Sequence, residues 1–168
     1  MNKIEIVQFA EQKLEEHGLA QKGWIFTFNQ AITYAGICDT LIKEIQLSQP
    51  ISKVETQDFI VDTILHEIAH AIVGAWHNHD RVWKACAKRI GARPEATYTD
   101  SESITSLRLS KTKYVICFGA EIVQLYLRKP NKKTIANITE YWIPKRKEET
   151  EGNLKIEVYN SSIHYMLT

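Results

Sequence analysis

The sequence predicts an α+β domain followed by a small module of antiparallel β-strands. A central helix is indicated by apolar residues at three- and four-residue spacing, namely Val61, Leu65, Ile68 and Ile72. Short runs of alternating apolar residues on both sides of this helix indicate strands. At 168 residues the chain has the length of one domain with a small appendage, which can bury a core without disulfide bonds.

Local signals set the elements before the central helix. Apolar residues at helical spacing between residues 4 and 14 predict an amphipathic helix that ends before Gly18. Residues 24–28 alternate in a way that predicts a strand, and residues 40–47 predict a second one. The segment 34–36 between these strands permits a turn.

Capping signals delimit the central helix and the helix after it. Ser52 and Glu55 have the spacing of a capping box, so the central helix is expected to begin near them and to end near Gly74. Asp80 is a good N-cap for a further helix, and Gly91 follows the end of that helix. The first domain is therefore expected to span residues 1–98.

The rest of the chain is expected to form a linker and a β-module. Residues 99–112 are rich in Ser and Thr and are interpreted as a linker or surface loop. The module then spans residues 113–168. Its strands are predicted at residues 114–118, 121–128, 134–143 and 154–159.

Composition favours a soluble cytoplasmic protein. The chain is 44% hydrophobic and 24% charged with a net charge of +1, which is ordinary for a globular domain. Cys38, Cys86 and Cys117 are far apart and form no Cys-x-x-Cys pair, which fits a reducing compartment. The N-terminal residues lack the pattern of a signal peptide, and no apolar run has the roughly 18 residues of a membrane span. No membrane partner is expected.

The central helix contains the motif His66-Glu67-Ile68-Ala69-His70. Two histidines four residues apart on a helix lie one turn apart on the same face, so both imidazoles can reach one metal ion. Glu67 would then lie beside a metal-bound water and take its proton as general base. With six histidines in the chain, about 0.02 such motifs are expected by chance. The motif predicts a catalytic zinc site with a third ligand elsewhere.

The third ligand is either His77 or His79, both of which follow the expected helix end at Gly74. The spacing differs from the metzincin pattern, in which the glycine and the last histidine each come one residue sooner. His79 directly precedes the N-cap Asp80, so the next helix would hold its backbone firmly. The residues alone leave both histidines open.

The motif, the following Gly74, the stretch His79-Asp80-Arg81-Val82-Trp83 and Gly91 together resemble the SprT-like metalloprotease domain, the family that includes Spartan. The resemblance covers about residues 23–91. It implies a zincin-like fold, one zinc ion bound by His66, His70 and His79, a catalytic Glu67, and Trp83 as a packing residue beneath the site.

The sequence departs from the family pattern in two places. Asp80 stands where the family usually has glycine, and it either caps the helix or alters the surroundings of the zinc ligands. Many family members continue with a zinc ribbon of paired cysteines, whereas the module here retains only Cys117. The module is therefore expected to be a degenerate, ribbon-like β-fold without metal.

The family resemblance also implies work on DNA-bound proteins. Residues 128–147 contain seven Lys or Arg residues with Glu140 as the acidic exception, and Tyr141 and Trp142 lie among them. Arg81 and Lys84 add positive charge to the helix after the metal motif. Single-stranded DNA or DNA–protein complexes are therefore expected partners beside the protein substrate.

The expected function is zinc-dependent hydrolysis of peptide bonds, with DNA-associated proteins as candidate substrates. The alternative is a non-catalytic adaptor for nucleic acid or protein that keeps zinc for structure. Glu67 argues against the adaptor, because a structural zinc site needs no base. A metallohydrolase that acts on another substrate class also has this motif.

Overall fold

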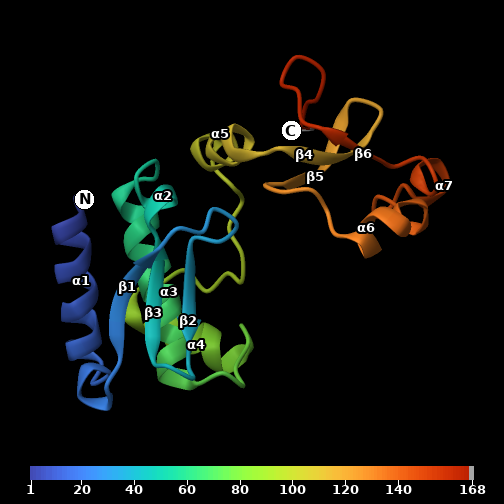
Figure 1. The fold of residues 1–168 in the computed structure, drawn as a ribbon. Coiled ribbons are helices and arrows are strands. Elements are labelled where there is room, and N and C mark those ends of the chain that lie inside the picture. The colour runs from blue at the N-terminus through green and yellow to red at the C-terminus, as the bar shows by residue number, and fades with distance from the viewer. Residues whose placement is uncertain (167–168) are drawn as a thin grey trace. The chain divides into compact units, whose positions relative to one another are not determined.

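The structure is a computed structural model that describes residues 1–166 (Figure 1). The chain forms two compact units, Met1–Leu107 and Arg108–Thr168, and helix α5 (Glu102–Lys111) contains their boundary. Helices and small sheets are both present, which confirms the α+β prediction. No helix in the described range is long and apolar enough to cross a lipid bilayer.

The first unit combines a three-stranded sheet with helices. Its elements in chain order are α1 (Lys3–Glu16), the 3-10 helix η1 (Ala20–Lys22), β1 (Ile25–Asn29), β2 (Gly36–Asp39), β3 (Glu44–Ser48), α2 (Gln49–Ser52), α3 (Gln57–Val73) and α4 (Arg81–Ile90). The strand order is β1-β3-β2, with β1 parallel and β2 antiparallel to β3. Strand β2 therefore forms one edge of this sheet.

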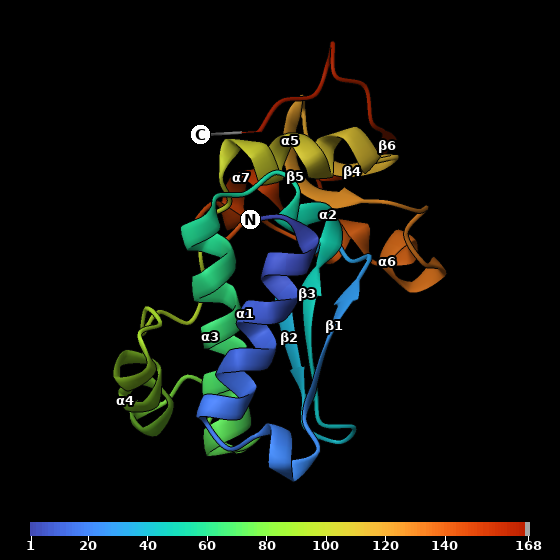
Figure 2. The ribbon, with the colours of Figure 1, turned by 90° about the vertical axis from the view of Figure 1, so that its left-hand side faces the viewer.

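Helices α1 and α3 cover one face of the sheet (Figure 2). Ile45 and Leu47 alternate along β3 and are buried against both helices. Ile64 and Ile68 of α3 belong to the same core, one turn apart. A second core joins the opposite side of α3 to α4 around the fully buried Trp83. Helix α3 is thus fixed on two sides, which makes it a rigid support for a site.

Two predicted boundaries in the first unit are wrong. The strand expected at residues 40–47 begins only at Glu44, because residues 40–43 form a turn in which the Asp39 side chain accepts hydrogen bonds from the Leu41 and Ile42 N–H groups. Leu41 contributed to the apolar pattern but is 93% exposed. The capping box at residues 52–55 does not form, because Ser52 ends α2 and Thr56 caps α3 instead.

The second unit is built on an antiparallel sheet of order β5-β4-β6, with β4 (Tyr114–Phe118), β5 (Glu121–Tyr126) and β6 (Lys155–Val158). Three of the four predicted strands are therefore confirmed. Their core contains Val115, Cys117 and Ile122. Short helices complete the unit, namely α6 (Lys132–Ala136), the 3-10 helix η2 (Ile138–Glu140) and α7 (Lys147–Thr150).

The fourth predicted strand, residues 134–143, is wrong, because α6 and η2 occupy much of it. The Asn131 side chain accepts the Thr134 N–H and starts α6, and this cap outweighs the β-propensity of the Ile and Thr residues that follow. Residues 102–111, within the segment interpreted as a linker or loop, form α5, whose Ile104 is buried.

Candidate metal centre

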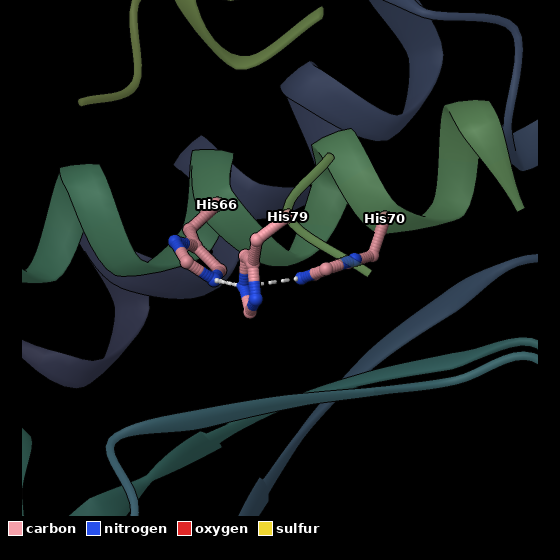
Figure 3. Close-up of side chains that lie close together, drawn as sticks. All are labelled: His66, His70 and His79. Atoms are coloured by element: carbon pink, nitrogen blue, oxygen red, sulfur yellow. Dashed lines mark hydrogen bonds between the residues drawn. The ribbon is translucent and has the colours of Figure 1, made fainter. Parts of the chain in front are cut away.

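Helix α3 carries the first two histidines and the glutamate beside them. The motif lies within this helix, as the sequence predicts, and Gly74 caps the end of the helix as expected. Gly74 has a φ of +88°, a backbone conformation that residues with a side chain rarely adopt. His66 and His70 lie one turn apart and point to the same side of α3 (Figure 3).

The loop between α3 and α4 brings His79 to the same place. Its Nε2 atom lies 3.0 Å from Nε2 of His66 and 3.1 Å from Nε2 of His70 (Figure 3). His79 has a φ of +55°, which is uncommon for a residue other than glycine. The structure therefore brings together the three histidines that the family resemblance implied as ligands.

His77, the other candidate for the third ligand, lies outside this group. Its Nδ1 atom is 2.8 Å from Oδ2 of Asp80. The other carboxylate oxygen of Asp80 accepts the N–H groups of Val82 and Trp83, so Asp80 is the N-cap of α4, as predicted. His79 lies between His77 and Asp80 in the chain. The two contacts of Asp80 therefore connect the loop that carries His79 to the start of α4.

Trp83 packs against all three histidine rings. Its ring centroid lies 4.6 Å from that of His66, 5.1 Å from that of His70 and 4.5 Å from that of His79. Because Trp83 is completely buried, it limits how far these rings can rotate. Its position agrees with the expected packing role.

Burial keeps the three imidazoles neutral. The pKa of His66 and of His70 is lowered to about 4. Burial is the main cause, and the charge of neighbouring histidines is the second. Burial also lowers the pKa of His79, and the positive charge of Lys84 lowers it further. At neutral pH each ring therefore keeps a nitrogen lone pair, which metal coordination requires.

Glu67 is held between α3 and strand β2. Burial raises the pKa of its carboxyl group to about 8, and a hydrogen bond from the Cys38 backbone N–H opposes this rise. The two elements are in close contact at Gly36, where a Cβ atom would lie 2.9 Å from Cγ of Glu67. The carboxyl group is therefore both buried and fixed in position.

A cavity of about 430 Å³ opens over the site. Its walls come from β2, the loop between α3 and α4, and the segment around Tyr98, and the three histidines and Glu67 line it. Because β2 is an edge strand, the cavity borders an edge of the sheet. A substrate can therefore approach the histidines and the carboxyl group together.

A set of residues next to His66 was not predicted from the sequence. The Tyr98 hydroxyl lies 3.4 Å from Nδ1 of His66, and Asp62 and Arg93 adjoin Tyr98. The available signal was Asp62, a carboxylate in an apolar helix one turn before His66. Tyr98 gave no signal, because it lies at the very end of the expected first domain, outside any predicted helix or strand.

A second group of metal-binding residue types lies in the C-terminal unit. The ligand atoms of Cys117, Glu157 and His164 are all within 4.8 Å of one another. However, the Asn160 N–H donates to Nδ1 of His164 at 3.0 Å, so the neutral ring carries its hydrogen on Nε2. This nitrogen faces Oε2 of Glu157 at 3.1 Å as a donor. The hydrogen bonds of this group are thus satisfied without an ion.

The three histidines of the first unit fit a metal ion better than the group in the C-terminal unit does. The ligand atoms of His66, His70 and His79 lie within 4.8 Å of one another, and the group could hold a metal ion. Bonds of about 2.0–2.1 Å to a tetrahedral ion would separate two ligand nitrogens by about 3.4 Å. The distances from Nε2 of His79 to Nε2 of His66 and of His70, 3.0 and 3.1 Å, are close to this value. Neutral imidazoles suit zinc and other first-row transition metals.

Comparison with known proteins agrees with the geometry. The model of the SprT-like family matches residues 4–105, a range that includes the three histidines and Glu67. No curated protein sequence gives a significant match. Because the family match spans more than half of the 168 residues, the chain belongs to the SprT-like family.

Proposed function

We propose that the protein is a zinc-dependent metalloprotease that hydrolyses peptide bonds. In this proposal His66, His70 and His79 bind the zinc ion and Glu67 is the catalytic base. The observation that carries the proposal is the convergence of three neutral imidazole nitrogens beside a buried carboxyl group in an accessible cavity. Membership of the SprT-like family supports a metallopeptidase.

Each residue of the site has a distinct role. A zinc ion held by His66, His70 and His79 would polarise the scissile carbonyl group and lower the pKa of a water molecule. Glu67 accepts the proton of that water as it attacks the carbonyl carbon. The carboxyl group then passes this proton to the leaving amine.

The surroundings of the cavity favour an extended peptide as substrate. Strand β2 is an edge strand, so the backbone groups on its outer side pair with no other strand of this sheet. An extended polypeptide can bind such an edge through its own backbone groups. Ile37 of β2 lines the cavity and is 40% exposed, so it offers an apolar contact to a side chain of the substrate.

DNA is a proposed second partner, through the C-terminal unit. Trp142 is 46% exposed, and the Lys147 ammonium lies 4.4 Å from the centre of its ring. Lys132 and Lys133 of α6 belong to the same basic segment, whereas Arg146 is paired with Glu121 and Glu149. An exposed aromatic ring in a basic segment suits a stacked base and its phosphate.

The proposal is tested by metal analysis and cleavage assays on the purified protein. Wild type is expected to hold about one zinc ion per chain and to cleave itself or an unfolded protein substrate. Glu67→Gln should retain zinc and lose cleavage. His79→Ala should lose zinc, whereas the matched variant His77→Ala should keep both zinc and activity.

Other outcomes would reject specific parts of the proposal. If His79→Ala kept zinc and His77→Ala lost it, the assignment of the third ligand would be wrong. If wild type bound zinc but cleaved no substrate of a broad protein and peptide panel, and Glu67→Gln behaved identically, the protein would be a non-catalytic adaptor.

The DNA partner needs a separate measurement. Binding of a fluorescent single-stranded oligonucleotide should weaken as salt concentration rises, because phosphate contacts release counterions. Trp142→Ala and Lys132→Ala should each weaken binding, whereas Lys3→Ala in the first unit should not. Cleavage measured with and without the oligonucleotide shows whether DNA stimulates the protease.

A further inference from the structure

A hydrogen-bonded set of side chains lies on the far side of the His66 ring from the metal position. Nε2 of His66 lies 3.0 Å from Nε2 of His79, whereas Nδ1 lies 3.4 Å from the Tyr98 hydroxyl. The two ring nitrogens therefore have different partners. In a neutral imidazole one nitrogen carries the hydrogen and the other has the lone pair, so the partner of Nδ1 decides whether Nε2 can bind metal.

Asp62 holds the Tyr98 hydroxyl in place. It lies one turn before His66 on α3 and is 8% exposed. Its carboxylate oxygens accept the Arg93 backbone N–H at 2.7 Å and the Arg93 Nε–H at 2.9 Å. Burial, followed by a hydrogen bond with Asp62, raises the pKa of Tyr98 well above its usual range.

The Tyr98 ring also contacts Arg93 and Phe59. The Arg93 guanidinium lies 4.6 Å from the ring centroid, and the Phe59 ring lies 5.5 Å away on a tilted plane. Arg93 thus binds both Asp62 and Tyr98. Such contacts hold a side chain in one rotamer, which a precise hydrogen bond to a ligand requires.

The direction of the hydrogen bonds follows from Asp62. A carboxylate that is paired with Arg93 only accepts, so the Tyr98 O–H must donate to it. The Tyr98 oxygen is then left as an acceptor for the Nδ1–H of His66. In this arrangement the lone pair of His66 is on Nε2, the nitrogen that faces Nε2 of His79.

We propose that Tyr98 is a positioning residue that, held by Asp62 and Arg93, fixes the His66 tautomer and ring orientation for metal binding. The inference rests on the proposed metal site and deepens it. Outer partners of this kind contribute to metal affinity because the ligand is ready to bind without rearrangement. In this role Tyr98 acts through His66 and is not itself a metal ligand.

Zinc affinity of Tyr98→Phe is the first test, measured by competition with a chromogenic chelator. The phenyl ring keeps its contacts with Arg93 and Phe59 but removes the acceptor for His66. We expect zinc to bind roughly 10- to 100-fold more weakly, with little change in the melting temperature of the metal-free protein. The matched control Tyr114→Phe in the C-terminal unit should bind zinc like wild type.

The His66 tautomer gives a second readout that needs no metal. Nitrogen NMR of the metal-free protein should show the hydrogen of neutral His66 on Nδ1 in wild type and a shift of the population toward Nε2 in Tyr98→Phe. Asp62→Asn should produce a similar shift, because an amide can donate to the Tyr98 oxygen and reverse the hydrogen bond. A variant with both substitutions should lose little more zinc affinity than Tyr98→Phe alone.

The outcomes separate this inference from the proposed function. If Tyr98→Phe bound zinc as tightly as wild type and left the His66 tautomer unchanged, Tyr98 would have no positioning role. If wild type bound zinc and hydrolysed no substrate while Tyr98→Phe weakened zinc binding, the inference would stand and the protease proposal would fail. If the wild-type tautomer carried its hydrogen on Nε2, the proposed hydrogen-bond direction would be wrong.

Discussion

Gly36 and Glu67 are in direct contact between strand β2 and helix α3. A Cβ atom added to Gly36 would lie 2.9 Å from Cγ and 3.0 Å from Oε1 of Glu67, and 2.8 Å from Cγ2 of Thr63. Real Cβ atoms essentially never approach other atoms so closely. The absence of a side chain at this position is therefore what lets the edge strand hold the proposed catalytic base.

Gly36→Ala is expected to abolish most proteolysis while leaving zinc bound. The added methyl group must displace Glu67 or move β2 away from α3, and overpacking of this kind typically costs about 1–3 kcal/mol of stability. Zinc content, cleavage rate and thermal unfolding are measured together. Thr63→Ser in the same protein relieves one of the two clashes, so it should restore part of the stability but little activity. Full activity in Gly36→Ala would show that the Glu67 position tolerates movement.

Asp80 is expected to control zinc affinity through the loop that carries His79. Asp80→Ala removes both the cap of α4 and the contact with His77, so zinc should bind roughly 10-fold more weakly. Asp80→Asn keeps an oxygen for the cap and should bind zinc within about 3-fold of wild type. Chelator competition measures both, with Asp58→Ala on α3 as an exposed acidic control. Equal affinities in all four proteins would contradict this role.

The parts of the site that were predictable from sequence are those that depend on local spacing. His66, Glu67 and His70 share one helix face, and Asp80 caps the helix that follows, so neighbouring residues suffice to place them. Gly36 and Tyr98 were not predictable, because their roles depend on contacts with α3 from residues about 30 positions away in the chain. No local pattern records such contacts.

In the fold, too, some elements were predictable from local sequence patterns and others were not. Strands β4, β5 and β6 lie in short runs of β-forming residues between turn residues and were predicted, whereas residues 134–143 have β-branched side chains but follow a strong side-chain cap at Asn131. The choice between His77 and His79 was also left open by spacing. It depends on the positive φ of His79, which turns this side chain toward α3 and is not visible in the sequence.

The metal-free protein is expected to lose stability on both sides of about pH 6.5. The pKa of His66 and of His70 is lowered from 6.5 to about 4, so the unfolded chain binds more protons between these values and stability falls as pH decreases through this window. The pKa of Glu67 is raised from 4.5 to about 8, so the folded state binds more protons there and stability falls as pH rises through that window.

Above about pH 6.5 the Glu67 effect remains without the opposing histidine effect. Urea unfolding with a chelator present should therefore show decreasing stability of wild type from about pH 6.5 to 8. Glu67→Gln has no ionisable group at this position and should show a much flatter profile. Parallel profiles for the two proteins would mean that Glu67 titrates near its ordinary pKa in the folded state.

The protein is expected to bind one zinc ion per chain, with the C-terminal group of Cys117, Glu157 and His164 taking none. The reason is the tautomer of His164: the Asn160 N–H occupies Nδ1, so Nε2 carries a hydrogen toward Glu157 and has no lone pair for an ion. Zinc content is measured for wild type, Cys117→Ser and His79→Ala. Cys117→Ser should keep the single zinc and His79→Ala should lose it. Two zinc ions in wild type, with one lost in Cys117→Ser, would show that zinc binding rearranges the His164 hydrogen bonds and that the C-terminal unit is a second metal site.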